Sequence, residues 1–120
     1  MVYLHRMFIR VIIIFSGASH IFYGITALIH PFFIYEYARY GFSDQRIAIG
    51  IIQSILGLTL LLGLSFNKLK VFASICLSVM MAGAFGTRVF IGDSIIQSIP
   101  SVAYFLINLT ILGYALNNRK

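Results

Sequence analysis

The chain has 120 residues, of which 60% are hydrophobic and 10% are charged, with a net charge of +6 and a mean hydropathy of +0.96. A soluble domain carries about 25% charged residues, and a chain this short has too little interior to hide so much apolar surface. The composition therefore excludes an ordinary soluble domain and predicts a single transmembrane domain over residues 1–120.

The first apolar segment predicts a transmembrane helix over about residues 7–30. Val11–Ile29 contains no Asp, Glu, Lys or Arg, and about 20 helical residues cross a hydrocarbon core of about 30 Å. Arg6 and Arg10 before an apolar run are also typical of a signal peptide, with Ser16–Ala18 as the small residues of a cleavage site. The apolar run continues well beyond these residues, which favours a membrane-spanning helix.

The connection after this helix predicts a short helix lying in the outer membrane interface. Pro31 is suited to the start of a helix and Gly41 to its end, with many aromatic residues between them. On such a helix Glu36, Arg39 and Tyr40 stand at i, i+3 and i+4, close enough to pair. One interpretation is a simple interfacial anchor; the other is an outer-face polar cluster in which a base pairs with an acid and closes the mouth of the bundle. The predicted cluster comprises Glu36, Arg39, Tyr40, Arg88 and Asp93.

Three further apolar segments predict the helices that complete an all-α, antiparallel four-helix bundle. They cover about residues 47–66, 71–90 and 95–116. The connection Asn67–Lys70 is short enough to require antiparallel neighbours. The apolar runs do not alternate in polarity along the chain, so a membrane β-barrel is not indicated.

Basic residues predict the orientation of the bundle. The two ends of the chain and the second connection carry six basic residues and no acid, whereas the other two connections carry three of each. The positive-inside rule therefore places both termini in the cytoplasm. The positive charge indicates topology and contact with anionic membrane lipids, and no nucleic-acid partner is expected. The six basic residues are Arg6, Arg10, Lys68, Lys70, Arg119 and Lys120; the other connections hold Arg39, Arg46, Arg88, Glu36, Asp44 and Asp93.

Polar side chains within the predicted helices indicate either a ligand pocket or packing contacts. His20 lies near the middle of the membrane, and Gln53 and Asn108 lie at comparable depth on the second and fourth long helices. Polar groups at this depth must bond to one another or to a bound molecule. We predict a pocket roofed by the aromatic residues of the outer connection; the alternative is that His20 is a packing histidine. The predicted ligand-binding residues are His20, Tyr23, His30, Gln53 and Asn108.

Signals for catalysis or metal binding are weak. Cys76 is the only cysteine, so an intramolecular disulfide or a CxxC pair cannot form. His20 and His30 are almost three helical turns apart, too far to share one metal ion. No nucleotide-binding loop, HExxH pattern or serine elbow occurs. We expect no metal and no catalytic activity from the chain alone.

Three motifs follow one another along nearly the whole chain. The first is Ser16-Gly17-Ala18-Ser19-His20 followed by Glu36 and Tyr40-Gly41-Phe42; the second is Arg46, Gly50, Gln53, Gly57 and Gly63; the third is Thr87-Arg88 followed by Gly92-Asp93-Ser94. Each motif is too short to indicate a family alone, so the resemblance depends on their order and spacing. In this order and spacing the chain resembles the DoxX-like family of small four-helix membrane proteins.

The resemblance implies a four-helix bundle with both termini inside the cell and a function that varies within the family. Some members are similar to subunits of membrane oxidoreductases that meet quinones, or to partners of redox enzymes. A distant animal branch resembles assembly chaperones for ion-channel receptors. The family often has Glu where this chain has Gln53, and a neutral amide cannot accept a proton, which weakens a proton-coupled or catalytic role.

The favoured function is that of a small non-catalytic multi-pass membrane protein that binds a partner protein or a lipid-like ligand within its helix bundle. The alternative is a membrane subunit of an oxidoreductase complex that holds a quinone. A lipid or a quinone is accordingly the candidate bound molecule. Membrane lipids, a membrane or redox partner protein and a second copy of the chain are the partners considered.

Overall fold

The computed structural model describes residues 2–117, with side chains from Leu4 onward. Four of its helices are long and apolar enough to cross a membrane, which confirms the predicted all-α membrane bundle. No strand occurs among the described residues. Two of the basic residues used to predict orientation, Arg119 and Lys120, lie outside the described part. In chain order the elements are α1 (Val2–Ile29), α2 (Pro31–Tyr40), the 3-10 turn η1 (Ser43–Gln45), α3 (Arg46–Leu62), α4 (Asn67–Phe90) and α5 (Ile95–Asn117).

The observed helices differ from the predicted ones at their ends. Helix α1 begins several residues earlier than predicted, and α4 begins at Asn67, inside the predicted connection. Helix α3 ends at Leu62, so the turn between α3 and α4 lies a few residues earlier than expected. Phe66 takes an extended conformation directly before α4 and sets the start of that helix. The predicted short helix between the first two spans is α2, which ends at Gly41 in the left-handed conformation with φ of 83°.

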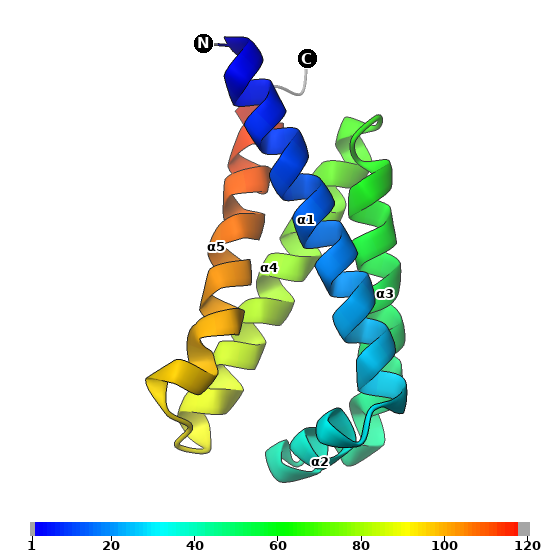
Figure 1. Cartoon of the computed structure of the whole chain (residues 1–120), viewed down its shortest axis with the longest axis vertical. Helices are drawn as coiled ribbons and strands as arrows, with labels where there is room; N and C mark the ends of the chain where they lie inside the picture. The colour runs from blue at the N-terminus through cyan, green and yellow to red at the C-terminus, as the bar shows by residue number, and fades with distance from the viewer. Residues whose placement is uncertain (1, 118–120) are drawn as a thin grey trace.

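The long helices are arranged as two pairs, α1 with α3 and α4 with α5 (Figure 1). The start of α1, the end of α5 and the turn between α3 and α4 lie at one end of the bundle, here called the terminal end. Helix α2 and the turn between α4 and α5 lie at the opposite end, called the α2 end. The pairs are close at the terminal end and separate toward the α2 end. The molecule is 44 Å long, close to the 40–45 Å of a bilayer with its headgroup regions.

Glycines on both helices let α1 and α3 pack at backbone distance. A Cβ atom added to Gly57 would lie 2.6 Å from the carbonyl oxygen of Gly17, and one added to Gly24 would lie 2.7 Å from that of Gly50. Both distances are too short for real atoms, so only glycine permits this separation. Small residues allow this kind of close approach between helices in membranes, where dispersion contacts drive association.

A compact apolar core fills the terminal half of the bundle. Ile13, Leu60, Leu77 and Ile111 come from the four long helices and are fully or almost fully buried. The amide of Asn67 donates a hydrogen bond of 3.2 Å to the carbonyl oxygen of Ala115, which joins the start of α4 to the end of α5. The space between the helix pairs is therefore closed at the terminal end, and any internal cavity must lie nearer the α2 end.

The contact between α1 and α3 provides a stability test. In Gly57→Ala the added methyl group meets backbone atoms of α1, so the two helices must move apart. We expect a loss of about 1–3 kcal/mol in the free energy of unfolding, typical of overpacking, measured by titration with a denaturing detergent. Gly113→Ala is the matched control, because nothing lies within 4 Å of the added methyl group. Equal stability of the two variants would contradict this account of the α1–α3 contact.

Candidate functional site

A buried histidine joins three of the long helices near the middle of the bundle. His20 on α1 is fully buried. Its Nδ1 atom lies 2.9 Å from Nε2 of Gln53 on α3, and its Nε2 atom lies 3.1 Å from Nδ2 of Asn108 on α5. The two bonds link the α1–α3 pair to α5, and we call these three residues, with Ser16, the polar junction.

The polar junction satisfies its own hydrogen-bonding groups. A neutral imidazole has one donor and one acceptor nitrogen, and an amide can present either an NH₂ group or an oxygen. Gln53 and Asn108 can thus serve both ring nitrogens of a neutral His20. The hydroxyl of Ser16, one turn before His20 on α1, donates a hydrogen bond of 2.7 Å to Oδ1 of Asn108. Such mutual satisfaction is required where no water is present to bond polar groups.

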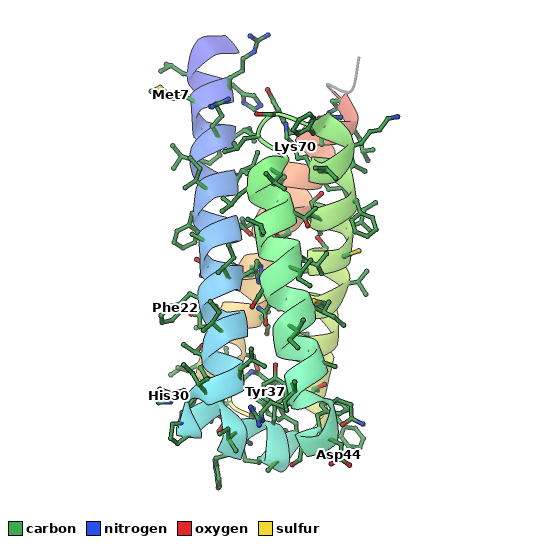
Figure 2. The ribbon with its side chains drawn as sticks, turned by 90° about the vertical axis from the view of Figure 1, so that its right-hand side faces the viewer. Met7, Phe22, His30, Tyr37, Asp44 and Lys70 are labelled. Atoms are coloured by element: carbon green, nitrogen blue, oxygen red, sulfur yellow. The ribbon has the colours of Figure 1, made fainter. Side chains whose placement is uncertain are left out.

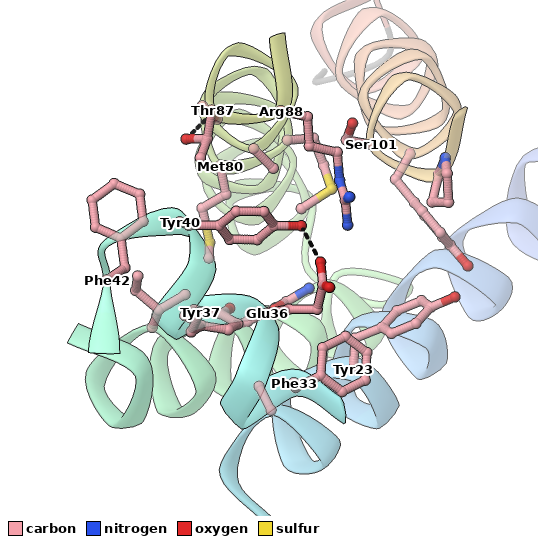
Figure 3. A pocket seen from close by; sticks show the side chains of 18 of the residues that line it. Tyr23, Phe33, Glu36, Tyr37, Tyr40, Phe42, Met80, Thr87, Arg88 and Ser101 are labelled. Atoms are coloured by element: carbon pink, nitrogen blue, oxygen red, sulfur yellow. Dashed lines mark hydrogen bonds between the residues drawn. The ribbon is translucent and has the colours of Figure 1, made fainter. Parts of the chain in front are cut away.

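A cavity of about 390 Å³ opens on the α2 side of the polar junction, and Figure 3 shows its lining. His20 and Gln53 form its floor. All five α-helices contribute to its surface, because the two helix pairs separate here and α2 crosses the opening. Small-molecule sites in proteins occupy about 300–1,000 Å³, so the cavity has the size of such a site.

The walls of the cavity are mostly aromatic and aliphatic. The rings of Tyr23 and Tyr104 lie 5.9 Å apart in an edge-to-face contact, and Tyr104 also lies 5.1 Å from the ring of His20. Phe33 on α2 contacts Tyr23 at 6.3 Å. The remaining apolar surface comes chiefly from Ala27, Ile49, Met80, Met81, Ala84 and Pro100. The cavity therefore has apolar walls above a polar floor.

A network of charged residues, with Tyr40, lies at the mouth of the cavity between α2 and the turn after α4. Arg39 bonds to Asp93 at 2.6 Å and to Glu36 at 2.7 Å. Arg88 bonds to Asp93 at 2.9 Å. The hydroxyl of Tyr40 donates a hydrogen bond of 3.0 Å to Glu36, which Figure 3 shows as a dashed line. Both guanidinium groups lie over the ring of Tyr40, with the Arg39 and Arg88 Cζ atoms 5.2 and 5.3 Å from its centroid. We call these five residues the mouth network.

The mouth network shifts the pKa values of Glu36, Asp93 and Arg39 toward the paired, ionised state. Hydrogen bonds from Arg39 are the main cause that lowers the pKa values of Asp93 and Glu36, against the opposing effect of burial. The same bonds raise the pKa of Arg39. Burial raises the pKa of Tyr40 to about 12, so its hydroxyl keeps the proton that it donates to Glu36.

The structure brings most of the predicted site residues together, in three different roles. His20, Tyr23 and Gln53 line the cavity. Asn108 lies behind the floor, where it is fully buried and holds His20. His30 lies outside the cavity: it is exposed, and its Nδ1 atom accepts a hydrogen bond from the backbone of Phe32 to cap α2. We therefore leave His30 out of the candidate site.

Helix α2 combines the two roles that its sequence left open. Phe33 and Tyr37 line the cavity and Tyr40 belongs to the mouth network. Phe32 and Tyr35 point outward and are 54% and 67% exposed, as an interfacial anchor requires. One face of α2 thus covers the cavity while the other is available to the membrane interface.

Several cavity and junction residues were not among the predicted ligand-binding residues. Tyr104 and Ser16 both stand one helical turn before a predicted residue, Asn108 and His20 respectively. The i, i+4 spacing that places such residues on one helix face was the available signal. Arg46 carried no comparable signal: it donates hydrogen bonds of 2.7 and 2.9 Å to the last carbonyl groups of α1, which only the three-dimensional arrangement reveals.

The mouth network predicts how α2 responds to substitution and to pH. Asp93→Asn removes the acid that both arginines share, so we expect a broader distribution of distances between spin labels at Tyr35→Cys and Ser94→Cys in a Cys76→Ser background.

Since the carboxyl pKa values are lower in the folded state, the pairing is complete above their ordinary value of about 4 and is lost as the pH falls through the lowered values. With the mouth network unsubstituted, the distribution of distances between the two spin labels should broaden only in that acidic range.

The control for this measurement is Asp44→Asn. Asp44 is an exposed acid at the same end of the bundle, so this variant makes the same change in net charge without touching the network. A narrow distribution in Asp93→Asn, or equal broadening in both variants, would show that the mouth network does not hold α2.

Comparison with known proteins identifies the chain at the level of its family. The model of the DoxX-like family matches residues 9–112, a range that includes the polar junction, the cavity and the mouth network. No curated protein and no solved structure matches the chain. With four helices suited to cross a membrane, the chain is a small multi-pass membrane protein, and it belongs to the DoxX-like family.

Proposed function

We propose that the protein binds a lipid-like molecule in the cavity between its two helix pairs. The observation that carries this proposal is the cavity itself, about 390 Å³ in volume, with apolar walls, a polar floor at His20 and Gln53, and α2 across its mouth. Pockets of this composition are typical of sites where an apolar ligand body is held and a few polar groups orient one end.

The cavity lies at a depth that a membrane lipid can reach. Its lining extends from His20 and Gln53, near the middle of the long helices, to Phe33 and Tyr40 on α2 at one end of the bundle. A binding role agrees with the lining chemistry, since Gln53 is a neutral amide that orients a ligand and does not transfer protons. A protein partner would instead contact the outer surface, where the exposed apolar side chains are also those expected to face lipid.

A quinone is the second candidate ligand, and the aromatic lining favours it. Tyr23, Phe33 and Tyr104 form a chain of ring contacts beside the floor, and aromatic rings pack well against a flat ring. In that case the protein would be the quinone-holding subunit of an oxidoreductase complex, with a redox partner supplying the electrons. Extraction of the purified protein distinguishes the two candidates, because a quinone has a characteristic ultraviolet absorbance that changes on reduction.

We propose in addition that both termini face the cytoplasm. Lys70 lies at the terminal end, and His30, Tyr37 and Asp44 lie at the α2 end (Figure 2). The described basic residues of the terminal end, Arg6, Arg10, Lys68 and Lys70, are accompanied there by no described acid. This asymmetry supports an inward terminal end under the positive-inside rule.

The orientation predicts the accessibility of single cysteines. In a Cys76→Ser background, Lys68→Cys should react with a membrane-impermeant thiol reagent only after the cells are opened. Asp44→Cys should react in intact cells, because it lies at the opposite end and is exposed. The pair controls for reactivity, since both positions are exposed. Labelling of Lys68→Cys in intact cells would contradict the proposed orientation and place the terminal end outside the cell.

Ligand binding is tested best by filling the cavity. Ala84 lines the cavity, so Ala84→Phe should reduce the amount of co-purified lipid-like molecule at least about tenfold while the bundle stays folded. Mass spectrometry of the extract measures the retained molecule, and circular dichroism checks the fold. Replacing His20 is less informative, because it also breaks the hydrogen bonds to Gln53 and Asn108 and leaves buried groups unsatisfied.

Ala82→Phe is the matched control for this experiment. Ala82 lies on the same helix but is exposed on the outside of the bundle, so the added ring meets lipid instead of the cavity. Equal retention by Ala84→Phe and Ala82→Phe would mean that no ligand occupies the cavity.

A further inference from the structure

This inference rests on the proposed binding of a lipid-like molecule in the cavity. The charged residues around the cavity determine which polar end such a molecule can have. We propose that the site selects an amphiphile whose polar end carries no net charge, such as an alcohol, ester, amide or ketone. The inference rests on three features of the site: a neutral floor, a charge-balanced mouth network and walls without a free charged group among the described lining residues.

The floor offers hydrogen bonds without net charge. The described hydrogen-bond partners of His20 are the two neutral amides of Gln53 and Asn108. Neither amide can act as a counter-ion to a charged headgroup. An uncharged hydroxyl or carbonyl group can exchange hydrogen bonds with an amide, so the floor suits a neutral polar end.

The mouth network is balanced within itself. Arg39 and Arg88 provide two positive charges, and Glu36 and Asp93 provide two negative charges, all joined by the three ion pairs. The only charged side chains that line the cavity, among the described residues, are Glu36 and Arg88. Each is already engaged, Glu36 by Arg39 and Tyr40, and Arg88 by Asp93.

The surroundings of the network keep this balance. The other charged residues of the α2 end are Asp44 and Arg46. Asp44 is exposed, and Arg46 is occupied by the terminal carbonyl groups of α1, whose partial negative charge it offsets. This end of the bundle therefore has three basic and three acidic residues, and it presents no unpaired charge toward the cavity.

A charged headgroup would have to enter this site without a counter-ion. The transfer of an isolated charge from water into an apolar environment is very costly, whereas a hydroxyl or carbonyl group needs only a hydrogen-bond partner. An anion at the mouth would add a third negative charge to a network whose two arginines are already neutralised by two acids, and a cation would add a third positive charge. Each would compete with existing charge-assisted hydrogen bonds.

The test uses three photoreactive probes that share one alkyl chain with a diazirine and differ only in the headgroup. The heads are glycerol, phosphate and trimethylammonium. The protein is embedded in nanodiscs of zwitterionic lipid, and mass spectrometry compares labelling at the cavity residues Met80 and Met81 with labelling at the lipid-facing Phe72 of the same helix. We expect the cavity-to-lipid labelling ratio of the glycerol probe to exceed that of each charged probe at least about tenfold.

Charge-changing variants then test whether the mouth network causes the selection. Glu36→Gln and Asp93→Asn each leave one excess positive charge and should raise the labelling ratio of the phosphate probe several-fold. Arg88→Gln leaves one excess negative charge and should do the same for the trimethylammonium probe. Asp44→Asn is the matched control, because it makes the same charge change at an exposed position outside the network.

The outcomes separate this inference from the proposed function. A charged probe that labels the cavity as well as the glycerol probe overturns the inference and leaves lipid binding standing. An equal effect of Asp44→Asn and Asp93→Asn overturns the role of the network. If no probe labels the cavity above the lipid-facing residue, the proposed function itself fails, and the inference with it.

Discussion

The arrangement depends on one requirement, that the polar side chains in the middle of a membrane bundle satisfy one another. His20 can do so only if α1 is held against both α3 and α5, because its partners Gln53 and Asn108 come from those two helices. Loss of either bond would leave a buried polar group unsatisfied at a cost of about 1–3 kcal/mol. The polar junction therefore connects the helix pairs at mid-height.

The two helix pairs are built differently on either side of this junction. Toward the terminal end, apolar side chains such as Leu60 and Leu77 fill the space between them. Toward the α2 end, the close glycine contacts keep α1 on α3 while the α4–α5 pair diverges, and a cavity remains. The cavity is thus a consequence of strong packing within each pair and weak packing between them, and it does not require a flexible segment.

Helix α2 covers part of this opening. Its apolar face supplies Phe33 and Tyr37 to the cavity, and Arg39 reaches across the mouth to Asp93 in the turn after α4. Arg39 thereby joins parts of the chain that are more than fifty positions apart in sequence. Since the charges are balanced within this network, the same contacts that hold α2 in place also leave no free charge at the entrance.

The sequence by itself determined the membrane class, the four spans and the short helix between Pro31 and Gly41, because hydropathy, span length and helix-ending residues act locally. It also indicated that His20, Gln53 and Asn108 lie at comparable depth in the membrane, because the helical rise per residue converts sequence position into distance along the helix. Only the tertiary structure decided which helices pair and where they separate. It therefore also decided that His30 lies outside the cavity, that Tyr104 forms part of the cavity wall and that Arg46 caps the end of α1. Those outcomes depend on crossing geometry and distant contacts, which no spacing along one helix encodes.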